Sequence, residues 1–170
     1  HGIAPREGFD FAKPVNAIPV TVDEFPLVQR HYPLVFGMGE GAAPLALVGL
    51  ANGNNLFIDE QGQWKPETYV PAYVRRYPFM LAKLMHDSEN LSLVIIKLDL
   101  LMDGEVSIQP PGDVPPVVYR GFRMVNEDKL RELRGDQARK LVQNGIMGLL
   151  YAHLMSLGHI ADLYGRANPQ

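Results

Sequence analysis

Apolar residues in this chain form short runs between turn-forming residues, and most runs lack the spacing of a long amphipathic helix. Asn52-Gly53 is typical of a tight β-hairpin turn, because both positions tolerate a positive φ. Two apolar runs flank it, which predicts that 45–50 pairs with 55–59. A second turn is expected at Gln61-Gly62. Strands are therefore predicted at 34–36, 45–50, 55–59, 91–102, 106–109 and 116–125.

The first half of the chain predicts only short helices. Thr21 followed by Glu24 fits a capping box, in which each residue satisfies a backbone donor near the helix start. In the stretch YVPAYVRRYPFML, Pro71 suits the first position of a helix and Pro78 stops it. That spacing predicts a helix of about two turns over 71–77.

Longer helical patterns gather at the C-terminus. The stretch 127–143 is amphipathic with mixed charges, and Gly135 is expected to split it in two. The last helix, about 145–165, is apolar on most sides. Since strands are locally connected and helices segregate to the end, we expect an α+β fold. Its sheet should be mainly antiparallel and could close into a barrel-like form, with short helices and a C-terminal apolar helix.

Composition limits the classes of function. The 170 residues suit one domain with its own core, and the net charge of −3 gives no reason to expect nucleic-acid binding. The chain has 0 cysteines, which excludes disulfides, thiolate nucleophiles and Cys-based zinc sites. It begins at His1, so we expect it to be part of a longer product. The 145–165 stretch carries polar residues, which predicts a buried helix with at most peripheral membrane contact.

One glycine-rich stretch resembles a dinucleotide-binding motif. Gly37, Gly39 and Ala42 fit the G-x-G-x-x-G/A pattern after a strand, and Asp59 follows at the distance of a ribose-binding acid. However, the following residues lack helical spacing and no further βαβ units follow. The pattern favours a glycine loop that joins two strands, and no cofactor is expected.

The titratable residues form no recognisable metal or catalytic motif. His153 and His159 are six apart, so they point in different directions on a helix and are expected to be hydrogen-bonded structural residues. Asp99, Asp103 and Glu105 cluster near a predicted turn. Such acids could perform acid–base chemistry or bind Ca²⁺, but they are also ordinary turn residues.

The tyrosines of YVPAYVRRYPFML are the leading binding candidates. Tyr69, Tyr73 and Tyr77 are four apart and share one face, while Arg75 and Arg76 project elsewhere. They form either an aromatic and cationic surface for a glycan, anion or protein, or a structural face that seats the helix on the sheet. The candidate contact residues are Tyr69, Tyr73, Arg75, Arg76, Tyr77, Asp59 and Trp64.

Four stretches together resemble a known family. They are NAIPVTVDEFPLVQRHYPLVF, PLALVGLANGNNLFIDEQGQW, YVPAYVRRYPFML and NGIMGLLYAHLMSLGHI. Their order and combination are similar to the bacterial SapC-like family, which is associated with surface-layer systems of gram-negative bacteria. The family has no established catalytic residue or cofactor. Its members carry an additional acidic segment between LSLVI and LDLLMDGEVSI. Here the sequence runs straight through, so we expect a single domain, 1–170, with a segment deleted or left out near 94–99.

The resemblance implies a non-enzymatic accessory or interaction protein of the cell envelope or surface layer. A protein partner or a second copy is expected to contact the 145–165 helix or the 69–81 surface. The compartment is left open between the cytoplasm and the periphery of the envelope. The alternative is an enzyme or binding protein for a small ligand, glycan or peptide. That alternative needs a pocket of at least ~300 Å³ in which Arg75 or Arg76 meets the tyrosines and an acid such as Asp59.

Overall fold

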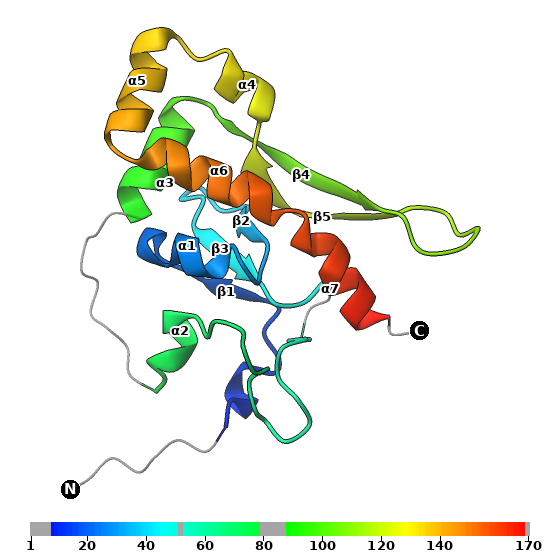
Figure 1. Cartoon of the computed structure of the whole chain (residues 1–170). Coiled ribbons are helices and arrows are strands. Elements are labelled where there is room, and N and C mark those ends of the chain that lie inside the picture. Colours follow the sequence, from blue (N-terminus) through cyan, green and yellow to red (C-terminus); the bar gives the residue numbers. More distant parts are fainter. Residues whose placement is uncertain (1–7, 51–52, 79–87, 169–170) are drawn as a thin grey trace, which may run out of the picture.

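An open, five-stranded antiparallel sheet forms the centre of the computed structural model, which describes residues 8–50, 53–78 and 88–168. Its order is β1-β3-β2-β5-β4, so β1 and β4 are edges and the sheet does not close into a barrel (Figure 1). The α+β fold with a mainly antiparallel sheet is confirmed. The strands are β1 (Ala17–Pro19), β2 (Leu34–Phe36), β3 (Pro44–Leu47), β4 (Leu101–Ile108) and β5 (Val117–Val125).

The three short strands β1, β3 and β2 form the buried half of the sheet. All three residues of β2 are buried, which explains its continuous apolar run. The loop 37–43 joins β2 to its antiparallel partner β3, and Gly37 N–H donates to Ala43 O at 2.9 Å. The prediction of a glycine loop between two strands is therefore confirmed. Pro44–Leu47 forms strand β3 at the position where a dinucleotide-binding motif would start its helix.

The strands β4 and β5 form a long hairpin that projects from the body of the protein (Figure 1). Their register pairs Leu101 with Val125 and Ile108 with Val117, and it shifts between Asp103 and Glu105. Gly104 lies at this irregularity. A Cβ atom there would lie 2.2 Å from the Phe122 ring, so the ring occupies the space that a side chain would need. The strands predicted at 106–109 and 116–125 are present as parts of β4 and β5, and they pair with each other.

Two strand predictions were wrong. The first half of 91–102 is helix α3 (Ser88–Lys97), and β4 begins only at Leu101. Leu91 and Ile95 are buried one turn apart, so the apolar run serves a helix face instead of a strand. The second error concerns 45–50, since β3 pairs with β1 and β2. Leu56 N–H does donate to Val48 O at 2.8 Å, but the described residues 53–59 form no β-strand.

The expected missing segment near 94–99 stays a prediction. Helix α3 ends in that region: Leu98 N–H donates to Val94 O at 3.0 Å, and Leu100 N–H donates to Ile95 O at 2.9 Å. Asp99 then adopts a φ of 51° before β4 begins. An additional segment in longer relatives would enter at this helix-to-strand connection.

Short helices lie in the first half of the described chain and longer ones at its end. The break predicted at Gly135 is confirmed, and the apolar C-terminal region is two helices with a turn between them. The helices are α1 (Phe25–Val28), α2 (Ala72–Arg75), α4 (Glu127–Arg131), α5 (Gly135–Gln143), α6 (Ile146–Ser156) and α7 (His159–Ala167), with 3-10 turns η1 (Asp10–Ala12) and η2 (Val22–Glu24).

Helix α6 crosses the sheet where β2 meets β5, and two of its polar side chains hold it there (Figure 1). His153 Nδ1 lies 2.7 Å from Leu34 O, and Val125 N–H donates to His153 Nε2 at 3.0 Å. Leu34 N–H donates to Ser156 Oγ at 2.8 Å. Strands β2 and β5 are paired only at Phe36 and Arg123. Helix α6 therefore supplies the hydrogen-bond partners for the backbone of Leu34 and Val125 that a neighbouring strand would otherwise provide.

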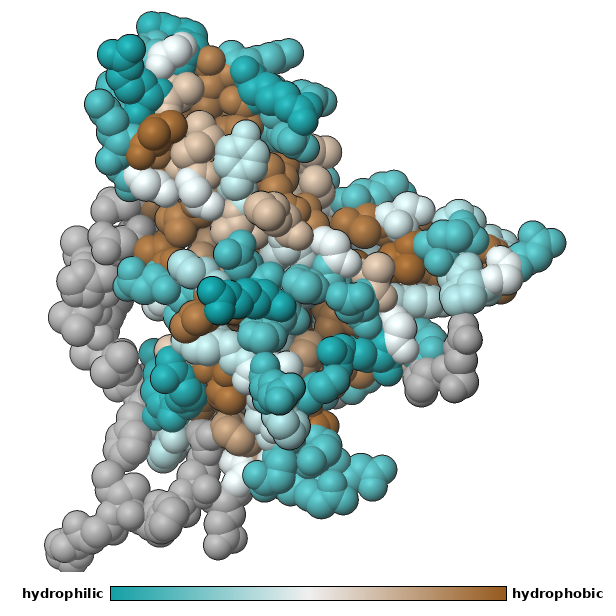
Figure 2. Space-filling view, in the orientation of Figure 1, coloured by the Kyte–Doolittle hydropathy of each residue, from teal (hydrophilic) through white to brown (hydrophobic). Residues whose placement is uncertain are grey.

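The stretch Ile146–Ala167 is the one described helical segment that is long and apolar enough to cross a membrane. Length and composition alone do not separate such a segment from a core helix. Within it, His153 and Ser156 are buried and bonded to the sheet, which is the behaviour of a core helix. Brown, tan and white residues nevertheless gather over the outer side of α6 (Figure 2). Met155 is 77% exposed there.

Candidate functional site

The residues 69–78 lie beside β1, at the edge of the sheet, and expose a row of aromatic and cationic side chains. Helix α2 is a single turn, Ala72–Arg75, which is shorter than the two turns predicted. Val74 is buried and packs into the core, whereas Tyr73 and Tyr77 are about half exposed, at 48% and 49%. Val74 therefore seats this helix on the core, and the expectation that the tyrosine face does so holds for Tyr69, which packs partly against the core, but not for Tyr73.

A buried carboxylate, Glu24, anchors this segment from below. Its Oε1 accepts hydrogen bonds from Ala72 N–H at 2.6 Å and from Tyr69 O–H at 3.0 Å. Its Oε2 accepts from the backbone N–H and the hydroxyl of Thr21, at 2.9 and 3.1 Å. Both carboxylate oxygens are thus satisfied, which is what allows an acid with 6% exposure to remain in place.

Tyr69 connects the buried acid to the surface. Arg75 Nη2–H donates to Tyr69 Oη at 2.9 Å, and its guanidinium lies 5.3 Å from the tyrosine ring centroid. Burial raises the pKa of Tyr69, and the negative charge of Glu24 raises it further. Arg75 is therefore an exposed residue whose guanidinium is held on a tyrosine hydroxyl.

The outer residues of the segment form two stacked pairs. The Arg76 guanidinium lies 4.2 Å from the centroid of the Tyr73 ring, within the range of a cation–π contact. Tyr77 stacks on Phe11, with centroids 4.0 Å apart and an interplanar angle of 10°. These contacts fix the orientation of the Tyr73 and Tyr77 rings, both of which remain about half exposed.

Two hollows lie on either side of Tyr73, between α2 and β1. One has a volume of about 320 Å³ and is mostly apolar, with Phe11, Val74 and Tyr77 in its wall. The other has a volume of about 430 Å³ and contains Glu24 and Arg76. Pro19 lines both, so the two hollows follow the same edge of the sheet.

The structure separates Asp59 and Trp64 from these hollows. Asp59 closes its own turn: Gln63 N–H donates to its Oδ1 at 2.7 Å, and Gly62 N–H donates to its backbone O at 3.1 Å. Trp64 is buried and donates from Nε1–H to Tyr32 Oη at 3.1 Å. The Tyr32 hydroxyl donates in turn to the backbone O of Tyr69 at 2.5 Å, so Trp64 supports the site indirectly.

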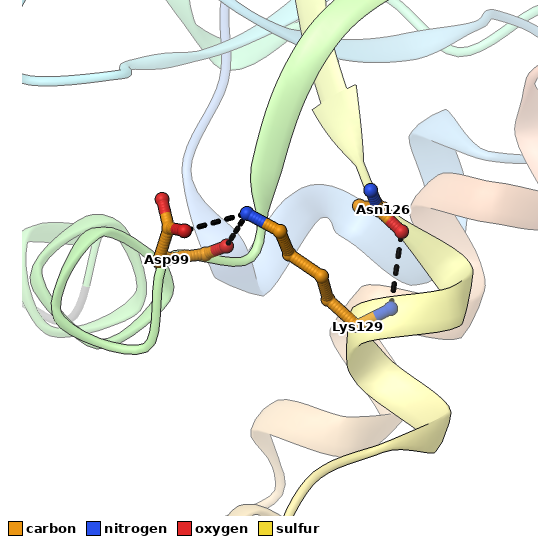
Figure 3. Close-up of polar contacts among 3 residues, drawn as sticks. All are labelled: Asp99, Asn126 and Lys129. Carbon is orange, nitrogen blue, oxygen red and sulfur yellow. Dashed lines mark hydrogen bonds and ion pairs between the residues drawn. The ribbon is translucent and has the colours of Figure 1, made fainter.

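Two of the acidic residues 99, 103 and 105 are paired with cations in the structure. Lys129 Nζ donates to Asp99 O at 3.0 Å and to Asp99 Oδ2 at 2.5 Å, which ties α4 to the end of α3 (Figure 3). Glu105 pairs with Arg120 at 2.7 Å. Asp103 does line a hollow of about 460 Å³ with Asp99, but Arg123 also lines it. Within the described ranges, no group of three His, Asp or Glu side chains could hold a metal ion.

His153 and His159 form hydrogen bonds, as expected. Burial lowers the pKa of His153 to about 4, because its ring is enclosed between α6 and the sheet. The roles of its two nitrogens follow from their partners: Nδ1–H donates to Leu34 O and Nε2 accepts from Val125 N–H. His159 Nε2 lies 3.0 Å from Gln29 O. His1 and His86 lie outside the described residues.

Sequence reasoning overlooked the two residues that organise this site most strongly. Glu24 was recognised only as part of a capping box with Thr21, and that local bond is present. Its bonds to residues 69 and 72 span 45 and 48 positions, so no local pattern could indicate them. Phe11 lies in a stretch without periodicity, and its stacking on Tyr77 is likewise a long-range contact.

These features define a class: an α+β protein with an open antiparallel sheet whose free edge carries an aromatic and cationic groove. The chain belongs to the SapC family, whose model matches residues 1–96 and 85–163. No curated protein and no solved structure matches the chain. The matched segments overlap at 85–96, next to the place where a family segment is expected to be missing.

Proposed function

We propose that this protein is a non-enzymatic interaction protein of the bacterial cell envelope or surface layer. It binds an extended peptide segment of a protein partner between α2 and β1. The observation that carries the proposal is the pair of hollows, about 320 and 430 Å³, that flank Tyr73 along an edge strand. An extended peptide can place alternate side chains in two such hollows while its backbone follows the edge.

The backbone of β1 supports this geometry. Val48 N–H donates to Asn16 O, and Val20 N–H donates to Pro44 O. Asn16 and Val20, which flank β1, therefore turn these hydrogen-bonding groups toward β3. In an antiparallel ladder the intervening residues turn theirs to the other side. Ala17 N–H and C=O therefore face the free edge, and Pro19 contributes a carbonyl without a donor.

Charge and aromatic character describe the expected peptide. Arg76 and Arg75 lie on the outer side of the groove, and the one acid in its wall, Glu24, already accepts from four donors. A carboxylate on the peptide would pair with Arg76, and an aliphatic side chain would enter the hollow beside Phe11 and Tyr77. The preferred segment is extended, apolar at one position and acidic two positions away.

The test begins with a photoreactive phenylalanine analogue placed at Tyr73 in native cells. We expect a cross-link to a partner whose attachment site lies in an extended segment, and none from the same analogue at Tyr151, which is 45% exposed on α6. A synthetic peptide of that segment should then bind with a Kd raised about tenfold or more by Tyr73→Ala or Arg76→Gln. Tyr151→Ala should leave the Kd unchanged. Equal cross-linking at both positions, or unchanged affinity in the Tyr73 and Arg76 variants, would exclude this groove as the peptide site.

A second candidate function rests on the 430 Å³ hollow alone. Tyr73 and Arg76 converge there with an acid, although the acid is Glu24 and not Asp59 as expected. The volume falls in the range of small-ligand sites, so a saccharide bound against the Tyr73 ring is the alternative. Saturable binding of a free glycan in a screen, lost in Tyr73→Ala and without any bound peptide, would favour this alternative.

A further inference from the structure

A fourth hollow lies between the turn that follows α1 and helix α7, away from the groove just described. Its volume is about 200 Å³. Phe57 and Thr68 contribute to its wall from the 53–78 region, and Leu163 closes it from α7. This volume is below the ~300–1,000 Å³ of sites that enclose a whole drug-sized ligand, so it suits a small group.

The polar side chains that line this hollow are mostly cationic or can become so. Arg30 and His31 come from the turn after α1, while His159 and Arg166 come from α7. The Arg166 guanidinium is held 4.8 Å from the centroid of the Phe57 ring, which fixes its position without using its N–H donors on an acid. Among the described residues, no carboxylate lies within 4.0 Å of the guanidinium nitrogens of Arg30 or Arg166.

The single acid in the wall already has a hydrogen-bond partner. Asp162 Oδ2 lies 2.9 Å from His159 Nδ1, and His159 Nε2 lies 3.0 Å from Gln29 O. Asp162 is therefore held on the His159 ring and not on either arginine. Among the described residues, Arg30 and Arg166 are left without a paired carboxylate.

The neighbouring histidine reports the resulting positive potential. Burial lowers the pKa of His31, and the charges of His159 and Arg30 lower it further. The titratable or charged groups that line the hollow with it are Arg30, His159, Asp162 and Arg166. A bound anion would offset the repulsion among the cations and favour protonation of His31.

We propose that this hollow binds a phosphate-sized oxyanion, held between the guanidinium groups of Arg30 and Arg166 with His31 as a pH-dependent third donor. Planar guanidinium groups match the geometry of phosphate oxygens. The group could be a free phosphate or phosphate ester, or the phosphate of a lipid headgroup. This inference does not depend on the peptide groove.

The first test uses inorganic phosphate and the full chain. Amide and histidine NMR signals should show saturable shifts confined to residues around the hollow, at constant ionic strength set with chloride. Arg30→Gln and Arg166→Gln should each weaken binding about tenfold or more, since each variant removes a charge-assisted hydrogen bond to the anion. The matched control is Arg139→Gln, which removes an exposed charge from α5 and should not change the affinity.

The pH dependence supplies a second readout. Phosphate should bind severalfold more tightly at pH 6 than at pH 7.5, after allowance for phosphate's own ionisation by comparison with sulfate. His31→Gln should remove that dependence while retaining binding. Unsaturable shifts over the whole surface, or equal weakening by Arg139→Gln, would overturn the proposal.

Vesicles distinguish the two sources of the phosphate. If the site takes a lipid headgroup, the protein should float with phosphatidylglycerol vesicles but not with phosphatidylcholine, and Arg30→Gln should release it. If the site takes a soluble ester, glycerol phosphate should compete with phosphate and neither vesicle should bind. Failure of phosphate, glycerol phosphate and both vesicles to bind would refute the oxyanion site.

Discussion

Two polar contacts fasten helices to the rest of this protein, and they differ in nearly every physical respect. His153 on α6 is fully buried and joins β2 and β5 through two neutral hydrogen bonds. Lys129 on α4 joins the end of α3 through an ion pair with Asp99, whose side chain is 85% exposed. The buried contact leaves backbone groups without partners if it is broken, whereas water replaces the exposed one.

Glu24 belongs with the buried type although it is charged. Its two oxygens accept from four donors on Thr21, Tyr69 and Ala72. A buried carboxylate without such partners would destabilise the fold. Conversely, removal of the Glu24 carboxylate would leave its four donors facing one another without an acceptor. The comparison therefore teaches that the number of orphaned partners, and not formal charge, determines how much each contact matters.

The largest effect is expected from His153→Leu. Leucine fills a similar volume but leaves Leu34 C=O and Val125 N–H buried without their partners. We expect the free energy of unfolding to fall by ~3 kcal/mol, because each orphaned buried group costs ~1–3 kcal/mol. Urea denaturation measures it. Met155→Leu, on the exposed side of the same helix, is the control and should shift the midpoint little. Similar losses from both variants would contradict the role given to His153.

The same histidine should make stability depend on pH. Its pKa is about 4 in the folded protein and 6.5 in the unfolded chain, so between these values the unfolded state binds more protons. The contribution is complete above pH 6.5 and is lost as the pH falls toward 4. The total loss is ~3 kcal/mol, at 1.36 kcal/mol per pKa unit. His31, whose pKa is also lowered, acts in the same direction.

Comparison of the wild type with His153→Leu isolates this effect from other titrating groups. Denaturation midpoints measured at intervals between pH 4 and 7 should fall more steeply in the wild type than in the variant. Parallel curves would show that His153 is protonated in the folded protein at a pKa near its usual value.

Glu24→Gln comes next in expected size. The amide retains the shape of the carboxylate but replaces one acceptor with a donor, which then faces donors of Thr21 or of Tyr69 and Ala72. We expect a loss of ~2 kcal/mol in unfolding free energy and weaker protection of the Ala72 amide from hydrogen exchange. The control is Asp23→Asn, an exposed neighbour. Unchanged exchange at Ala72 in the Glu24 variant would break the link between this acid and α2.

Local patterns in the sequence predicted the parts of the fold that depend on nearby residues. The strands β4 and β5 follow from two apolar runs on either side of a Pro-rich link, and the break at Gly135 follows from a glycine between two helical stretches. The run 91–102 was misread because its β-branched residues are also compatible with a helix that buries Leu91 and Ile95. Apolar content alone does not distinguish the two when a run is this short.

The candidate site was only partly predictable for the same reason. The exposed tyrosines and arginines near 73–77 could be recognised by their type and spacing. The position of β1 at the sheet edge could not, because it depends on pairing with β3, some thirty residues later. The burial of Glu24 depends in the same way on residues 69 and 72.

The smallest effect is expected at the exposed contact. Lys129→Met should leave the urea midpoint close to that of the wild type, because solvent screens the pair and hydrates Asp99 when the lysine is absent. The change should instead appear in the titration of one group. The hydrogen bond from Lys129 and its charge hold the pKa of Asp99 below its usual value, so NMR should show that pKa rising in the variant. Added salt should raise the wild-type pKa and leave the variant nearly unchanged. If Lys129→Met instead destabilises the protein as much as His153→Leu, exposure is the wrong basis for separating the two contacts.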